Sequence, residues 1–165
     1  MIKKPWPSAF RTCWNNDQRY QQYWTEHPPF YFTGDFAIQD SDGYIQVLGR
    51  SDDVLNIAGH RLGTAEVESA LVAHPAVAEA AVIALPDELK GEQLIAFVTL
   101  QTQEVQDIGD TLREHVKSVI GRFAHIERFN FTPKLPKTRS GKIMRRLLRS
   151  QELGEEVGDT STLEE

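Results

Sequence analysis

The residues best suited to chemistry lie in segment 136–142, Pro-Lys-Thr-Arg-Ser-Gly-Lys, in which Lys142 follows a glycine turn. A basic helix is expected directly behind it, over residues 140–149. A flexible lysine ammonium at such a turn can be aimed at phosphate or carboxylate oxygens and acts there as a mobile point charge. The segment therefore predicts a catalytic arm that reaches a small anion.

Charge is unevenly distributed around Lys142. Residues 134–149 hold seven basic and no acidic residues, whereas residues 151–165 hold six acidic and no basic ones. In the expected helix, apolar residues recur at helical spacing and arginines fall between them, so one face can pack while the other stays charged. The apolar residues are Ile143, Met144, Leu147 and Leu148, and the arginines are Arg145, Arg146 and Arg149.

The basic segment has three interpretations: a solvated helix face, a nucleic-acid patch, or a site for a small anion. The whole chain carries a net charge of -6 and has a pI near 5.4. No aromatic residue stands among the basic ones to stack on bases. A compact anionic ligand fits better than a polyanion, and we expect no nucleic-acid partner.

Length and composition limit the class of protein. With 165 residues and 40% hydrophobic content, the chain can bury one core, or one domain of about 100 residues plus a remnant. No apolar run approaches the roughly 20 residues that cross a bilayer, and the N-terminus lacks a signal peptide. We expect a soluble, cytoplasmic protein without a membrane partner. Cys13 is the only cysteine, which excludes an internal disulfide and a cysteine-based metal cluster.

The first half of the chain predicts hairpins joined by a polar connector. Residues 1–30 hold all three tryptophans and one short helical candidate at 17–24. Strands are expected at 31–36 and 44–49, joined by a turn that ends in Asp-Gly. A second hairpin is expected from strands at 54–57 and 60–62. The connector at 50–53 between the two hairpins could be a hinge.

The second half alternates helices and strands. Thr64 is expected to cap a helix at 65–73, and strands follow at 76–85 and 93–100. A helix at 108–120, ended by Gly121, precedes a strand at 126–131 and the final basic helix. The order predicts an α+β fold: a small domain in which helices pack on a short sheet.

Four motifs occur in one order along the chain. They are Tyr-Phe-Thr-Gly-Asp at 31–35, Gly-Arg-Ser-Asp-Asp at 49–53, Asn-Ile-Ala-Gly-His-Arg at 56–61, and segment 136–142. Together they resemble the AMP-forming acyl-CoA synthetases of the adenylate-forming superfamily. Segments 59–66, 136–146 and 158–163 look like the acetyl-CoA synthetase subfamily, whose near relatives are the propionyl-CoA synthetases. The similarity covers almost the whole chain.

The resemblance implies a two-step reaction and a two-domain enzyme. Acetate and ATP give an acetyl-adenylate and pyrophosphate, and CoA then displaces AMP. Residues 1–51 would be the C-terminal remnant of the large adenylation domain, 52–53 the hinge, 54–150 the small C-terminal domain and 151–165 an acidic tail. The small domain rotates about the hinge residue Asp52 between the half-reactions. An ordinary turn at Asp52 is the alternative.

For the nucleotide, the resemblance implies three ligands. Asp35 matches the acid that binds the ribose hydroxyls. Arg50 matches an arginine that holds ribose or phosphate, and Arg61 one that contacts the α-phosphate. A turn carboxylate and surface salt bridges are the alternatives.

For CoA, the resemblance implies a tunnel and a nucleotide contact. Gly59 matches a glycine that lines the pantetheine tunnel, where a Cβ would obstruct the thiol. Its alternative is a simple hairpin glycine. Ala58 stands where the subfamily often has Ser, and Lys117 stands where an Arg contacts the CoA nucleotide.

Lys142 matches the lysine that is essential for adenylation, where it bridges the carboxylate and the α-phosphate. Reversible acetylation by an acetyltransferase and a deacetylase would neutralise it and stop the first step. Val72, His74 and Val77 match positions whose backbone carbonyls hold a magnesium ion in relatives. A turn without a metal is the alternative there.

The sequence holds no Gly-rich phosphate loop and no adenine or acyl pocket, which belong to the large domain of this family. We therefore expect a C-terminal portion of the enzyme that does not form acyl-adenylate by itself and needs the large domain as its partner. A stand-alone regulatory or complementing module, and a synthetase for propionate or another short-chain acid, are the alternatives.

Overall fold

The chain folds into two compact units, Met1–Asp52 and Asp53–Glu165. The computed structural model describes residues 2–25, 28, 30–51, 54–57, 60–88, 91–102, 107–158 and 160–164. The side chains of residues 48, 54–56, 60 and 61 lie outside this description. Each unit is built around its own contacts.

The first unit contains one helix and one hairpin. Helix α1, Asp17–Thr25, confirms the helix expected at 17–24. Strands β1, Asp35–Gln39, and β2, Ile45–Arg50, pair antiparallel. The strand expected at 31–36 instead begins at Asp35, because Gly34 takes a left-handed φ of 75° that interrupts an extended chain.

Tyr31 is the centre of an aromatic cluster in the first unit. Four rings lie with their centroids 5.1 to 6.2 Å from that of Tyr31. They belong to Trp6, Phe10, Tyr23 and Trp24. Burial, followed by the nearby Tyr23, raises the pKa of Tyr31 above its ordinary value. These aromatic residues thus pack on one another through edge-to-face, tilted and stacked contacts, whereas Trp14 is 89% exposed.

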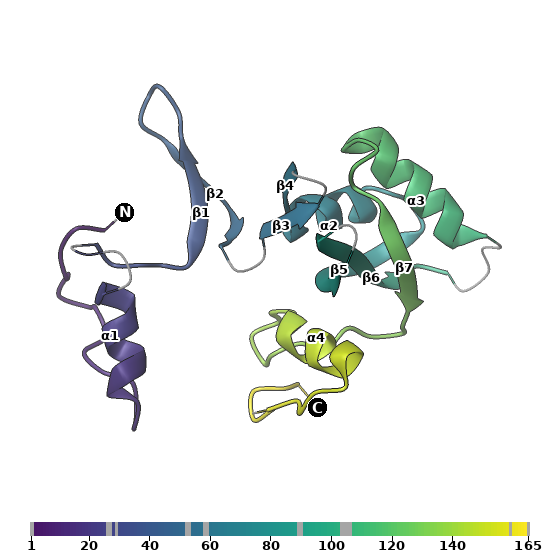
Figure 1. The fold of residues 1–165 in the computed structure, drawn as a ribbon. Coiled ribbons are helices and arrows are strands. Elements are labelled where there is room, and N and C mark those ends of the chain that lie inside the picture. Colours follow the sequence, from purple (N-terminus) through teal and green to yellow (C-terminus); the bar gives the residue numbers. More distant parts are fainter. Residues whose placement is uncertain are drawn as a thin grey trace. The chain divides into compact units, whose positions relative to one another are not determined.

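The second unit is a small α+β domain, as the element order predicts (Figure 1). A hairpin of β3, Val54–Ile57, and β4, His60–Gly63, precedes a sheet in the order β5-β6-β7. Strand β5 is antiparallel to β6, and β7 is parallel to β6. The sheet strands are β5 Val77–Asp87, β6 Gly91–Leu100 and β7 Ile126–Phe131; the helices are α2 Thr64–Val72, α3 Ile108–Val119 and α4 Arg145–Leu153.

Helices cover both faces of this sheet (Figure 1). On one face, Val82 and Ala96 pack with residues of α2 and α3, including Leu71 and Leu112. On the other face lies the α4-side cluster, which consists of Ala81, Ile83, Leu85, Ile95, Phe97, Leu135 and Leu148, with Ile143 packed against it. Because successive strand residues point to opposite faces, a sheet covered on both sides has nearly continuous apolar strands. This explains the unbroken apolar runs in β5 and β6.

Three of the differences from the sequence expectation in this unit have a local cause. The prediction that Thr64 caps the helix is wrong, because Gly63 occupies the N-cap position and Thr64 is the buried first residue of α2. Strand β5 continues through Pro86, which an edge strand tolerates since its outer side needs no donor. Helix α4 begins at Arg145, five residues later than expected, because residues 136–144 form a tight hairpin.

No helix that the structure describes combines the length and the apolar content needed to cross a membrane.

Candidate functional site

Lys142 lies on the returning arm of a short hairpin. Lys137 and Ile143 form its antiparallel bridge, and the Thr138 N–H donates to the Lys142 carbonyl at 2.8 Å. The Lys142 N–H in turn donates to the Thr138 hydroxyl oxygen at 3.1 Å. Gly141, with a φ of 81°, makes the reversal that a residue with a Cβ adopts only at a cost. The backbone around Lys142 is therefore held by several short-range bonds.

Two apolar residues, one just before the hairpin and one on its returning arm, fasten it to the sheet. Leu135 is fully buried, and Ile143 packs with it on the α4-side cluster. Lys142, the neighbour of Ile143, is exposed. Within the described part of the chain, its ammonium has no hydrogen bond or ion pair. The arrangement presents a free cation on a fixed support.

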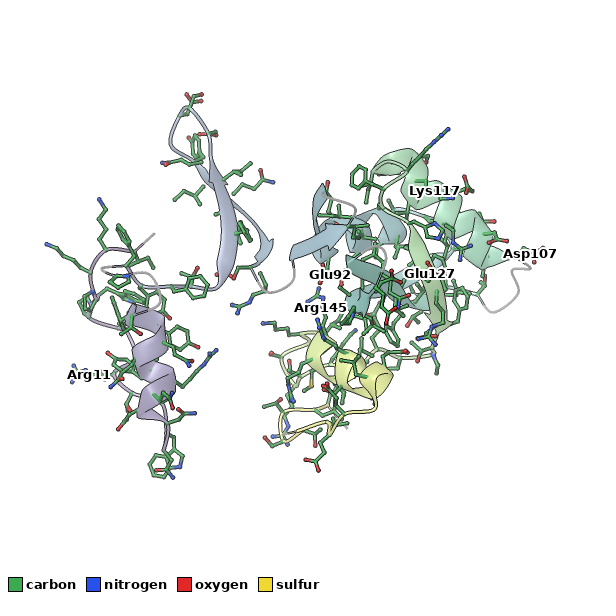
Figure 2. The ribbon with its side chains drawn as sticks, viewed as in Figure 1. Arg11, Glu92, Asp107, Lys117, Glu127 and Arg145 are labelled. Carbon is green, nitrogen blue, oxygen red and sulfur yellow. The ribbon has the colours of Figure 1, made fainter. Side chains whose placement is uncertain are left out.

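Most other cations of the basic segment are already paired. Lys134 lies 3.5 Å from a Glu164 carboxylate oxygen, and Lys137 pairs with Glu79 of β5. The Arg146 Nη1 donates to the Val157 carbonyl at 2.7 Å. Arg145 reaches from the first turn of α4 toward the sheet, where it pairs with Glu68 (Figure 2). Carboxylates and a carbonyl thus engage four cations of the segment, and Lys142 remains, with Arg139 and Arg149, an exposed cation without a described side-chain partner.

In the first unit, the structure brings Asp35 and Arg50 together. The two residues face each other across the β1–β2 hairpin, with Arg50 Nη1 3.5 Å from Asp35 Oδ1. The same Nη1 donates to the Thr33 carbonyl at 3.1 Å. A Cβ on Gly34 would lie only 2.7 Å from Arg50 Nη2. The glycine therefore makes room for the guanidinium beside the carboxylate.

Several predicted site residues lie outside the described part of the chain. This is the case for the hinge residue Asp52 and for the CoA-tunnel residues Ala58 and Gly59. Arg61 pairs with Asn56 in the β3–β4 hairpin, but its side chain also lies outside the description.

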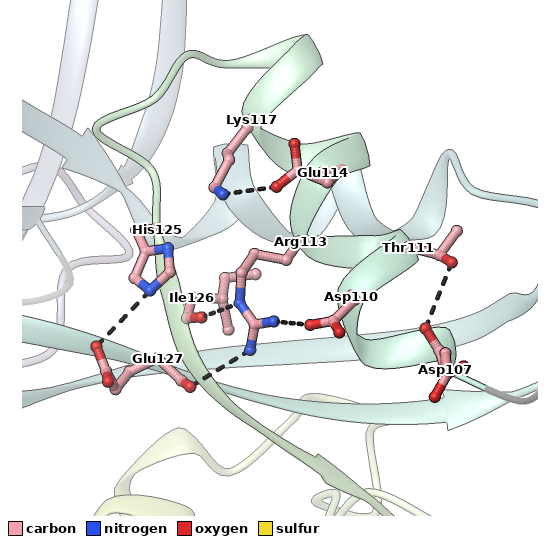
Figure 3. A network of polar contacts seen from close by, with 9 residues as sticks. All are labelled: Asp107, Asp110, Thr111, Arg113, Glu114, Lys117, His125, Ile126 and Glu127. Atoms are coloured by element: carbon pink, nitrogen blue, oxygen red, sulfur yellow. Dashed lines mark hydrogen bonds and ion pairs between the residues drawn. The ribbon is translucent and has the colours of Figure 1, made fainter.

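Lys117 lies on α3 and is engaged in a local ion pair. Its Nζ donates to Glu114 Oε1 at 2.6 Å, and this hydrogen bond holds the pKa of Glu114 below its ordinary value (Figure 3). On the same helix, Arg113 Nε donates to the Ile126 carbonyl of β7 at 2.9 Å. Arg113 thereby ties α3 to the sheet edge, so the helix that carries Lys117 is fixed.

The three carbonyls predicted to hold magnesium lie where α2 ends and β5 begins. The His74 carbonyl accepts the Val77 N–H at 3.0 Å, and the Val77 carbonyl lies 3.5 Å from Gln101 Nε2. Val72 is the last residue of α2, where backbone carbonyls lose their helical partners. Neutral carbonyl oxygens suit a hard cation, and each can accept a second contact. Among the described residues, no group of three or more His, Cys, Asp or Glu side chains could hold a metal.

Glu68 is a structural residue that sequence reasoning missed. Glu68 is 9% exposed, and its carboxylate accepts the Val82 N–H at 2.8 Å and two bonds from Arg145. The helical spacing could have indicated that Glu68 is buried, because Thr64, Glu68 and Leu71 share the buried face of α2. A carboxylate on a buried helix face requires a partner.

Residues 66–142, from the first turn of α2 to Lys142, match the family model of the AMP-binding enzyme C-terminal domain. This part of the chain belongs to that family. The resemblance to adenylate-forming enzymes inferred from the motifs is confirmed.

Relatives and solved structures agree with this assignment. The acetyl-coenzyme A synthetase of Deinococcus radiodurans is 55% identical over 167 residues, which cover 100% of this chain and 26% of the relative. A Brucella canis acyl-CoA synthetase structure is 42% identical, with a TM-score of 0.60, and the match covers 78% of this chain and 24% of that one. The structure of the o-succinylbenzoate CoA synthetase of Bacillus subtilis, in complex with its acyl-adenylate, is 30% identical, with a TM-score of 0.66. That match covers 74% of this chain and 25% of the synthetase. The chain thus spans about a quarter of the length of its relatives and corresponds to their C-terminal part.

Proposed function

We propose that this chain is the C-terminal part of an AMP-forming acetyl-CoA synthetase, an acid-thiol ligase. The whole enzyme would convert acetate, ATP and CoA to acetyl-CoA, AMP and diphosphate through an acetyl-adenylate. The observation that carries this proposal is Lys142, an exposed cation without a described partner, on an anchored turn at the end of the AMP-binding enzyme C-terminal domain. The 55% identity with an acetyl-coenzyme A synthetase supports the choice of substrate.

In this proposal, Lys142 acts in the adenylation step. Its ammonium would bridge the attacking carboxylate and the α-phosphate while negative charge shifts between them. A cation on a rigid turn is preorganised for this purpose, and loss of one such group typically costs about 3 to 4 kcal/mol of transition-state stabilisation. Acetylation of the Lys142 amine would remove the charge, so a lysine acetyltransferase and a deacetylase are its proposed regulators.

The other site residues would bind the nucleotide and CoA. Asp35 would accept the ribose hydroxyls, with Arg50 beside it as a donor to ribose or phosphate, and their 3.5 Å separation supports a shared ligand. Arg61 would contact the α-phosphate. For CoA, Ala58 and Gly59 would line the thiol tunnel, and Lys117 would exchange its Glu114 partner for a phosphate oxygen.

The remaining assignments concern the metal and the domain motion. The carbonyls of Val72, His74 and Val77 would hold a magnesium ion. The positive charge of the ion would interact with the partial negative charges of these oxygens at the end of α2. Asp52 would be the hinge on which residues 54–150 rotate relative to the large domain. The large domain, which would carry the phosphate loop and the acyl pocket, is the proposed partner of this chain.

A hybrid enzyme tests the proposal. Residues 1–165 replace the matching C-terminal quarter of the Deinococcus radiodurans relative, and pyrophosphate release is measured with acetate and ATP. We expect the hybrid to form acetyl-adenylate and the isolated chain to release no pyrophosphate above blank. In the hybrid, Lys142→Ala should reduce adenylation by about two to three orders of magnitude, whereas thioester formation from supplied acetyl-adenylate should persist.

Arg149→Ala is the matched control, because Arg149 is also an exposed cation of the basic segment. It should leave both half-reactions unchanged. Full adenylation by Lys142→Ala, or pyrophosphate release by the isolated chain, would contradict the proposal.

A further inference from the structure

The C-terminal segment 160–164 pairs with the hairpin that carries Lys142. Leu163 forms an antiparallel bridge with Thr138. The Arg139 N–H donates to the Thr162 carbonyl at 3.0 Å, and the Glu164 N–H donates to the Lys137 carbonyl at 2.8 Å. These two bonds form a short antiparallel ladder between segments more than twenty residues apart.

Residues 137 and 138 therefore form the middle strand of a small three-stranded arrangement. On one side they bond to the returning arm, through the Lys137–Ile143 bridge and the Thr138 to Lys142 bond of 2.8 Å. On the other side they bond to segment 160–164. A middle strand with partners on both sides has less freedom than a strand with one exposed edge. The tail thus limits the motion of the turn from the side opposite to Lys142.

Contacts upstream of this segment direct the tail toward the hairpin. The Val157 carbonyl accepts Arg146 Nη1 at 2.7 Å, and Gly158 follows with a φ of 65°. A Cβ at Gly158 would lie 2.7 Å from the same Arg146 nitrogen. The glycine thus permits both the left-handed turn and the close arginine. The chain leaves α4 and returns along the Lys142 hairpin because of this local geometry.

Main-chain bonds matter more here than side-chain charge. The one ion pair of segment 160–164 with the basic segment, Lys134–Glu164, measures 3.5 Å, and both side chains are about half exposed. Such exposed pairs contribute little in water. The backbone hydrogen bonds of the ladder therefore account for how the tail restrains the hairpin. A substitution at position 164 can separate their contribution from that of the ion pair.

We propose that segment 160–164 is a positioning strand for Lys142. It fixes the middle strand of the hairpin, and through it the turn from which the Lys142 side chain extends toward its anion. That the held cation acts in adenylation rests on the proposed function above, whereas the holding effect itself does not.

The first experiment measures amide hydrogen exchange by NMR in the 165-residue chain. Glu164→Pro removes the N–H that bonds to the Lys137 carbonyl, and Glu164→Ala removes only the carboxylate. In Glu164→Pro we expect exchange at Arg139, Thr138 and Lys142 to be about tenfold faster, while the Ala96 amide in the central strand β6 is unchanged. Glu164→Ala should stay within about twofold of the unaltered chain at all four amides.

Unchanged exchange at Thr138 and Lys142 in Glu164→Pro would overturn the proposal, even if Arg139 exchanged faster. If Ala96 also exchanged faster, the tail would support the whole domain rather than the turn, and the proposal would again be wrong. A chain that ends at Gly158 serves as the second variant. It should reproduce the result of Glu164→Pro at Thr138 and Lys142.

The second experiment separates the half-reactions in the hybrid enzyme. We expect Glu164→Pro to lower the rate constant of adenylation about tenfold with little change in KM for ATP, and to leave thioester formation from supplied acetyl-adenylate unchanged. Equal losses in both half-reactions would overturn the positioning role. If the unaltered hybrid forms no acetyl-adenylate, the proposed function fails, and the exchange experiment still decides whether the tail holds the turn.

Discussion

The carboxylate of Glu68 accepts two bonds from one arginine, Arg145 Nε at 2.8 Å and Nη2 at 2.6 Å. The same carboxylate also accepts the backbone N–H of Val82. One side chain therefore joins α2, β5 and the first turn of α4. Since Arg145 lies three residues after Lys142, this contact also fixes the C-terminal end of the hairpin that presents Lys142.

Glu68→Gln should destabilise the domain by about 2 to 4 kcal/mol, because a neutral amide replaces the carboxylate to which the partly buried Arg145 guanidinium donates two bonds. Glu66→Gln changes an exposed residue of the same helix in the same way and should stay within about 0.5 kcal/mol. Urea unfolding followed by circular dichroism measures both free energies. Equal effects of the two substitutions would show that the Glu68–Arg145 contact does not stabilise the fold.

Gly34→Ala should displace the Arg50 guanidinium from Asp35. The added Cβ would lie 2.7 to 2.9 Å from three guanidinium atoms, and the residue would keep a left-handed φ. Gly43→Ala is the control, because Gly43 also has a positive φ but its Cβ would meet nothing closer than 3.8 Å. If Asp35 and Arg50 bind the nucleotide together, only Gly34→Ala should raise the Kd for AMP in the hybrid enzyme, by about tenfold.

Isothermal titration of AMP measures this difference. Parallel losses for the two alanine variants would point to backbone strain instead, which costs about 1 kcal/mol at either glycine. An unchanged affinity in Gly34→Ala would remove the support for a joint nucleotide site at Asp35 and Arg50.

Local patterns in the sequence predict much of the fold correctly. The expected helix at 108–120 and strand at 126–131 agree with α3 and β7 within one residue. In α3 the reason is the spacing of Ile108, Leu112 and Val116, which all face the core. The Pro-Lys-Thr-Arg-Ser-Gly-Lys motif likewise predicts the family, because a motif is recognised from consecutive residues alone. Their long-range partners do not have to be known.

Contacts between distant residues account for what the sequence does not predict. Helical spacing extends back to Ile143, yet this residue belongs to a bridge with Lys137, so the helix starts later. The sequence shows residues 151–165 only as an acidic tail, although Glu164 lies in a ladder with Lys137. Charge and periodicity describe each segment alone, whereas these pairings depend on how the chain returns on itself.

Lys117→Met should raise the pKa of Glu114 toward its ordinary value of 4.5, because the hydrogen bond from Lys117 is the main reason why it is lowered. A carboxylate whose pKa is lower in the folded state stabilises that state above the unfolded pKa. This contribution is lost as the pH falls from about 4.5 through the lower folded value. NMR titration of the Glu114 side chain measures the change.

Leu135→Ala should loosen the support of the Lys142 hairpin. Leu135 is fully buried in the α4-side cluster, and the cavity left by its truncation should cost about 2 to 5 kcal/mol. Leu153→Ala is the matched control in α4, since Leu153 is 39% exposed and should cost less than about 1 kcal/mol. Urea unfolding measures both values, and amide exchange at Lys142 should be faster only in Leu135→Ala. If the hairpin kept its exchange rates despite the lost stability, its rigidity would come from its own backbone bonds and the C-terminal strand, and not from the apolar anchor beneath it.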